Sequence, residues 1–102
     1  MTALRPFHLA FPVRDLNAAR TFYKEVLGLK EGRRDKTWVD FDFFGHQVVF
    51  HYDKTLESKS VINAVDGHGI PVPHFGVVLS LPDWKALATS LKQKQITFIV
   101  EP

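Results

Sequence analysis

The chain has 102 residues and a mass of 11.7 kDa, which suits one domain and excludes a multi-domain organisation. Its composition is 45% hydrophobic, 13% aromatic and 24% charged, close to that of an average globular protein, so we expect a folded core rather than disorder. The 13 basic and 11 acidic residues give a formal net charge of +2, and because the two signs are interspersed, nucleic acid is not an expected partner.

The chemistry open to the chain is limited by its lack of cysteine. Disulfides, thiolate nucleophiles and thiolate metal sites are excluded, and any metal would need histidine, carboxylate or water ligands. No run of about 18 apolar residues is present, as a membrane span would require, and the first residues lead into strand-like rather than signal-like sequence. We therefore expect a soluble, cytoplasmic protein with no membrane partner.

The first 53 residues predict a strand, a helix and three further strands. Residues 6–13 are apolar and suit a pleated surface, which predicts a strand. From Asp15, apolar residues recur at steps of three and four up to Leu27, which predicts an amphipathic helix that Gly28 ends. A short strand over 29–34 is followed by a hairpin of residues 37–43 and 46–52 around a turn at 44–45. Asp40 and Asp42 fall on the face of this hairpin that we expect to meet solvent.

The rest of the chain partly repeats this pattern. Residues 54–71 show no steady period, so we expect a long connection, with one helical turn at 61–65 as an alternative. A strand over 72–79, a helix that begins at Pro82 and a strand over 96–100 are then predicted. Aligning His8 with His74 gives an internal repeat of about 66 residues. We divide this single domain into a first module (1–53), a connection (54–71) and a partial second module (72–102).

The run FHLAFPVRDLNAARTFYKEVLGL at residues 7–29 resembles the opening module of the vicinal oxygen chelate superfamily. That superfamily includes glyoxalase I, the extradiol dioxygenases and the bleomycin and fosfomycin resistance proteins, and residues 67–76 resemble the start of its second module. The resemblance implies an α+β fold of paired βαβββ modules around a cup that holds a divalent metal. The second module is incomplete here, so we expect a truncated sequence that lacks roughly 25 to 40 residues.

The repeated histidines are the first candidates for a metal site. His8 and His74 hold equivalent places on the expected first strands, so a pseudo-twofold pairing of the modules would bring both imidazoles to one axis. Two imidazoles and a carboxylate suit iron, manganese, nickel or zinc and leave positions open for substrate oxygens. The resemblance implies that His8 and His74 are ligands, with the carboxylate on a last strand that this sequence does not reach. Taken singly, either histidine is more often a core or surface residue than a ligand.

Two further histidines lie on the expected fourth strand. The resemblance implies an acid or base role near His46, as in the extradiol enzymes, and a metal neighbour near His51, where glyoxalase I has a carboxylate ligand. Because five positions separate them, they should face opposite sides of a regular strand. We favour His51 as a metal neighbour and keep His46 as a less certain catalytic candidate. For both, a solvent-facing or strand-end role is an equally open alternative.

The favoured function is a metal-dependent enzyme that acts on a small-molecule substrate with vicinal oxygens. A histidine rather than a glutamate on the fourth strand favours a dioxygenase over a glyoxalase-like lyase. One alternative is a metal-free small-molecule or antibiotic-binding protein of the resistance type, and another is an interaction domain that uses the fold without a pocket. Homodimers are common in the superfamily, so we expect a homodimer.

Overall fold

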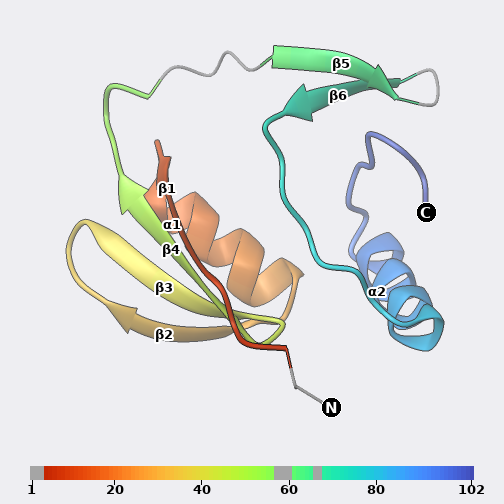
Figure 1. Ribbon diagram of the computed structural model, residues 1–102, viewed down its shortest axis with the longest axis horizontal. Helices are drawn as coiled ribbons and strands as arrows, with labels where there is room; N and C mark the ends of the chain where they lie inside the picture. The colour runs from red at the N-terminus through yellow and green to blue at the C-terminus, as the bar shows by residue number, and fades with distance from the viewer. Residues whose placement is uncertain (1–3, 57–60, 66–67) are drawn as a thin grey trace. The chain divides into compact units, whose positions relative to one another are not determined.

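The computed structural model of the chain describes residues 4–56, 61–65 and 68–102, and over 61–65 and 68–72 it describes the backbone alone. The chain divides into two units, Met1–Leu56 and Glu57–Pro102 (Figure 1). The boundary between them falls where the apolar hairpin pattern gives way to the polar residues that follow Tyr52.

The first unit has the order strand, helix and three strands. Its elements are β1 (His8–Val13), α1 (Leu16–Arg20) with its π-helical continuation η1 (Thr21–Val26), β2 (Lys30–Arg34), β3 (Trp38–Phe43) and β4 (His46–Tyr52). The sheet order is β1-β4-β3-β2, with β1 parallel to β4 and the other pairs antiparallel. The predicted βαβββ module and the α+β class are therefore confirmed.

The first helix begins and ends at the predicted residues. The Asp15 side chain accepts a hydrogen bond from the backbone N–H of Ala18 at 2.9 Å, which satisfies one donor of the first turn. Gly28 has φ +72°, the left-handed conformation that glycine adopts at no steric cost. The last turns widen into η1, where the N–H of Leu27 donates to the carbonyl of Phe22, five residues earlier. The spacing of apolar residues did not predict this wider turn.

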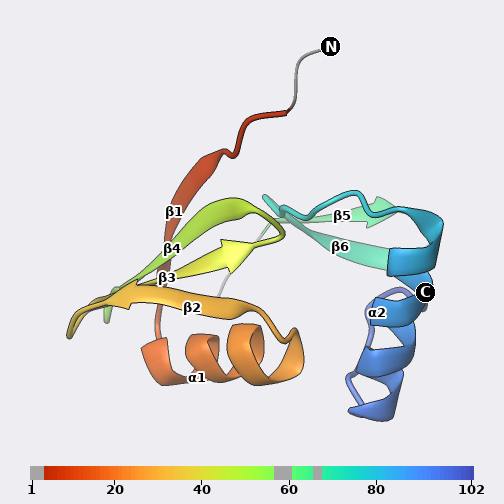
Figure 2. The same ribbon diagram turned by 90° about the horizontal axis from the view of Figure 1, so that it is seen from below.

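The core of this unit lies between the helix and one face of the sheet (Figure 2). Val39, Phe41, Val48 and Phe50 are almost completely buried, and Tyr23 from η1 packs against them with its ring centroid 4.5 Å from that of Phe50. Burying each such side chain stabilises the fold by about 1.5 to 3 kcal/mol. No helix of residues 4–56 covers the opposite face, which is therefore open to carry a site.

The second unit begins with a hairpin where the sequence predicted a connection. Strands β5 (Val61–Val65) and β6 (His68–Val72) pair antiparallel, so the predicted loop and the alternative helical turn are wrong for these residues. Pro71 lies in this ribbon, which is possible because each strand of a two-stranded sheet has a free edge. The parts of the predicted connection at 57–60 and 66–67 lie outside the described residues.

The predicted second helix is confirmed as α2 (Leu81–Gln93), whose N-cap residue Ser80 accepts from the N–H of Asp83 at 3.3 Å. The strands predicted over 72–79 and 96–100 are wrong, since residues 73–79 and 96–100 have no strand assignment. Their apolar residues suit a strand, but strand formation also needs a neighbouring strand to complete the hydrogen bonds. The assignment of 72–102 to a second module stays a prediction.

Candidate functional site

The open face of the first sheet carries a line of polar side chains. Strand alternation separates them from the buried set on the helix side, and the register places His8 opposite Gln47 on β4 and Asp42 opposite Gln47 on β3. Asp40 lies two residues before Asp42 on the same face. The open face thus carries a histidine, an amide and a carboxylate on three neighbouring strands.

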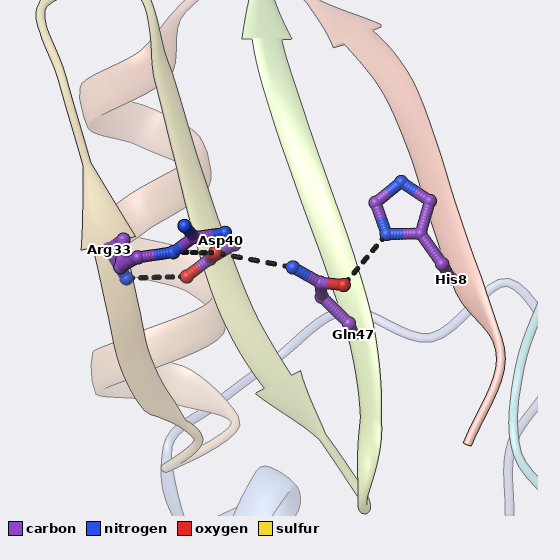
Figure 3. A network of polar contacts seen from close by, with 4 residues as sticks. All are labelled: His8, Arg33, Asp40 and Gln47. Atoms are coloured by element: carbon purple, nitrogen blue, oxygen red, sulfur yellow. Dashed lines mark hydrogen bonds and ion pairs between the residues drawn. The ribbon is translucent and has the colours of Figure 1, made fainter. Parts of the chain in front are cut away.

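These side chains form a connected network across all four strands (Figure 3). His8 Nδ1 lies 2.8 Å from Gln47 Oε1, and Gln47 Nε2 lies 3.4 Å from Asp40 Oδ2. The backbone N–H of Arg33 donates to Asp40 Oδ1 at 2.5 Å, and Arg33 Nε lies 3.4 Å from Oδ2. An exposed imidazole is thereby linked through an amide to an ion pair.

Asp40 is buried, with 6% of its surface exposed, so the expectation that it points at solvent was wrong. The reason is an irregularity in β2: Glu31 pairs with Phe41 and Arg34 with Val39, so that residues 32 and 33 together face Asp40. Such a bulge re-aims the backbone, here toward the carboxylate. A Cβ at Gly32 would overlap Asp40 Oδ1, so glycine is needed for this close approach.

Asp42, in contrast, is exposed as predicted, and its carboxylate accepts from the backbone N–H of Gly45 at 2.7 Å in the hairpin turn. It therefore serves the turn between β3 and β4. The two carboxylates on one face of one strand have different environments because the bulge covers only the first of them.

His46 lies at the start of β4 and is half-buried. Its Nδ1 accepts the backbone N–H of Phe7 at 3.0 Å, and its ring stacks on that of Phe7 with centroids 4.0 Å apart. Alternation places it on the same side of the strand as Val48, opposite to Gln47. The structure thus gives His46 a contact that fixes the start of β1, and it does not bring His46 to the side chain of His8.

His51 is exposed and shares the open face with Gln47. Four residues along β4 separate the two, a distance of about 13 Å. Because Gln47 is opposite His8, His8 and His51 are separated by about the same distance along the sheet. Two imidazoles on one zinc ion, each at about 2.1 Å from it, have nitrogens less than about 4.2 Å apart. The arrangement of the first unit therefore does not place His51 on an ion held by His8.

His74 belongs to the second unit, where it is exposed in the segment between β6 and α2. Among the described residues, no group of three or more histidine, aspartate or glutamate side chains is arranged to hold a metal ion. Within the first unit, His8 fits a ligand role, because it is exposed and its Nδ1 lies 2.8 Å from Gln47 Oε1. Metal ligands commonly have such a second contact on the other ring nitrogen.

A surface depression of about 370 Å³ lies beside the network, and Gly32, Arg33, Asp40 and Gln47 contribute to its lining. Sequence reasoning missed Asp40 and Gln47 as site residues. The available signal was the hairpin register: a two-residue turn at Phe44 and Gly45 places residue 47 opposite 42, and hence close to Asp40 on the same face.

An ion pair and a tyrosine lie on the helix side of the sheet. Arg20 Nε lies 2.5 Å from Glu31 Oε1 and Nη2 lies 3.2 Å from Oε2, and the hydrogen bond from Arg20 holds the pKa of Glu31 below its ordinary value. Burial raises the pKa of the Tyr23 phenol, because the charged form would lose hydration. The ion pair joins the helix to β2, so these groups stabilise the sheet rather than line the open face.

Comparison with known proteins identifies the family. The sequence profile of the Glyoxalase/Bleomycin resistance protein/Dioxygenase superfamily matches residues 5–102, and the chain belongs to this superfamily. No curated protein gave a significant match. In the described residues, no helix has the length and apolar character to cross a membrane.

Solved structures with the same fold support this assignment. A glyoxalase/bleomycin resistance protein/dioxygenase from Alicyclobacillus acidocaldarius is 33% identical with a TM-score of 0.72, and the match covers 89% of this chain and 64% of that one. The present chain thus spans less than two thirds of that relative. A lactoylglutathione lyase from Agrobacterium tumefaciens matches with 19% identity and a TM-score of 0.58, over 95% of this chain and 73% of that one, which shows a shared fold.

Proposed function

We propose that the chain is part of a metal-dependent enzyme that acts on a small molecule with adjacent oxygen atoms, with His8 and His74 as metal ligands. The observation that carries the proposal is the contact between His8 Nδ1 and Gln47 Oε1 at 2.8 Å. It fixes the ring while Nε2 is left for coordination, as hydrogen bonds to the other ring nitrogen do in metal-binding histidines. Superfamily membership supports the same chemistry.

The residues of the open face have distinct roles in this proposal. A bound divalent ion would supply Lewis acidity to the substrate oxygens. His8 binds the ion, and the neighbouring depression receives the substrate, with Arg33 beside it to attract negative charge. We propose a dioxygenase reaction rather than a glyoxalase-like one on the sequence alone, because a histidine and not a glutamate stands on the fourth strand; neither His46 nor His51 lies beside His8. We also propose that the protein acts as a homodimer in the cytoplasm.

Metal titration of the purified chain tests the proposal. We expect Fe²⁺, Mn²⁺, Ni²⁺ or Zn²⁺ to bind stoichiometrically, and His8→Ala and His74→Ala each to weaken binding by more than the 10- to 100-fold that is typical of an outer-shell change. His51→Ala is the matched control, because it removes an exposed histidine from the same face about 13 Å away and should leave binding unchanged.

The result also separates the enzyme from the metal-free alternative. If His8→Ala and His74→Ala both bind metal as the unmodified chain does, the ligand assignment is wrong. If the unmodified chain binds no metal and holds a small ligand equally well with and without EDTA, the protein is of the binding type.

A further inference from the structure

Asp40 and its neighbours form the fixed end of the network on the open face. The carboxylate is buried and held by the backbone N–H of Arg33 at 2.5 Å and by the Arg33 guanidinium at 3.4 Å. The missing side chain of Gly32 leaves the space that Asp40 Oδ1 occupies. In this ion pair Asp40 only accepts hydrogen bonds, so it presents a fixed acceptor oxygen to β4.

Gln47 must turn its donor toward that oxygen. Its Nε2 lies 3.4 Å from Asp40 Oδ2 and its Oε1 lies 2.8 Å from His8 Nδ1. Rotation of the amide by half a turn would set Oε1 against the carboxylate, so two acceptors would face each other. The hydrogen-bond partners of an amide decide its orientation. For Gln47 the contact to Asp40 is long, but it still decides the orientation, because the flipped amide would place its oxygen against the carboxylate.

The orientation of Gln47 in turn decides which nitrogen of His8 carries the proton. An amide oxygen cannot donate, so Nδ1 of a neutral His8 ring must be the donor in the 2.8 Å contact. The lone pair of the neutral ring is then on Nε2. Imidazole in water prefers the opposite tautomer, with the proton on Nε2, so the network has to impose this state on an exposed ring.

We infer that Asp40 and Gln47 are positioning residues that set the tautomer of His8 and so present the Nε2 lone pair to the site. The use of that lone pair for metal binding rests on the function proposed above, whereas the tautomer does not. The state of a histidine on β1 is thus controlled from β3, through one amide that lies between the two strands (Figure 3).

Replacement of one carboxylate oxygen of Asp40 by an amide nitrogen should reverse the orientation of Gln47 and, through it, the tautomer of His8. In Asp40→Asn, the side-chain oxygen still accepts from the N–H of Arg33, and the new amide nitrogen takes the place of Oδ2. It then faces Gln47, and the exposed guanidinium of Arg33, which also contacted Oδ2, turns away into solvent. Gln47 then rotates, offers Nε2 to His8, and leaves Nδ1 as the acceptor. His8 should move its proton to Nε2. The matched control is Asp42→Asn, which removes the same charge from an exposed carboxylate on the same face of β3.

Long-range ¹H–¹⁵N correlation spectra of the metal-free chain in alkaline buffer report the tautomer directly. We expect the protonated nitrogen of His8 to be Nδ1 in the unmodified chain and in Asp42→Asn, and Nε2 in Asp40→Asn. Gln47→Leu should also move the proton to Nε2, because the ring then follows its preference in water. These spectra read the ring itself, which a general loss of stability would not switch.

The outcomes separate the control of the His8 tautomer from the metal proposal. A proton on Nε2 of His8 in the unmodified chain, or on Nδ1 in a folded Asp40→Asn variant, overturns the inference that Asp40 and Gln47 set the tautomer. If Asp40→Asn does not fold, the unmodified chain and Gln47→Leu still decide. Failure of Ni²⁺ or Zn²⁺ to bind the unmodified chain overturns the metal site and leaves the tautomer result intact. With both in place, Asp40→Asn should lower metal affinity by about 10- to 100-fold.

Discussion

Substitution of Gly32 by alanine is the most direct test of the bulge that buries Asp40. The added Cβ would overlap Asp40 Oδ1, so the carboxylate has to leave the backbone N–H of Arg33. Loss of a hydrogen bond to a charged group costs about 1.5 to 3 kcal/mol. Reduced freedom of the unfolded chain returns about 0.4 to 1 kcal/mol for a glycine-to-alanine change. The net expectation is a loss of about 0.5 to 2.6 kcal/mol in the free energy of unfolding.

Urea unfolding followed by Trp38 fluorescence measures this loss in the first unit. The variant is made in a Trp84→Phe background, because Trp84 is the second tryptophan of the chain and belongs to the other unit. The midpoint should fall while the slope stays constant. Gly76→Ala is the control: its Cβ would meet nothing within 4 Å and it lies in the other unit, so the midpoint read by Trp38 should not change. If Gly32→Ala is as stable as the parent, or more stable, the close approach of β2 to Asp40 is wrong.

Two further predictions follow from the ionisable groups on the helix side. The raised pKa of Tyr23 means that the contribution of Tyr23 to stability is constant below the ordinary phenol pKa of 10.0 and is lost as the pH rises from there through the folded value. Tyr23→Phe should remove both the late phenolate absorbance transition and this alkaline loss. A Tyr23 transition at the ordinary pKa would contradict the prediction. The lowered pKa of Glu31 means that Glu31→Gln should cost about 1 kcal/mol at neutral pH. This difference should vanish as the pH falls below 4.5 through the lowered pKa, and equal urea midpoints for variant and parent at pH 7 would refute the contribution of the Arg20 contact.

The first module was predictable because its signals are local. Asp15 and Gly28 mark the helix ends through side-chain capping and a positive φ, and the alternation of residues 38–43 is confirmed by the burial of Val39 and Phe41. The π-helical turn was not predictable, because the same apolar spacing fits either helical geometry. Local chemistry therefore specified the elements but not every detail of their winding.

The second unit shows where local signals fail. Residues 73–79 and 96–100 have strand-like composition but no strand assignment, while β5 and β6 form in a stretch without a steady period. Pairing partners rather than propensity decide such cases. The site has the same limit: Asp40 was expected in solvent because its burial depends on an irregular pairing of β2, which no alternation in the sequence reveals.

The place of β1 at the outer end of the sheet has a consequence for how the site assembles. This strand is joined to the sheet through β4, and His8 and its partner Gln47 are 39 positions apart. Closing so long a loop costs entropy that the compact hairpin of β3 and β4 avoids. We therefore expect β1, with His8, to pair with the sheet only after β4, with Gln47, has formed. Fraying of β1 should break the contact of His8 while the remaining strands stay protected from hydrogen exchange.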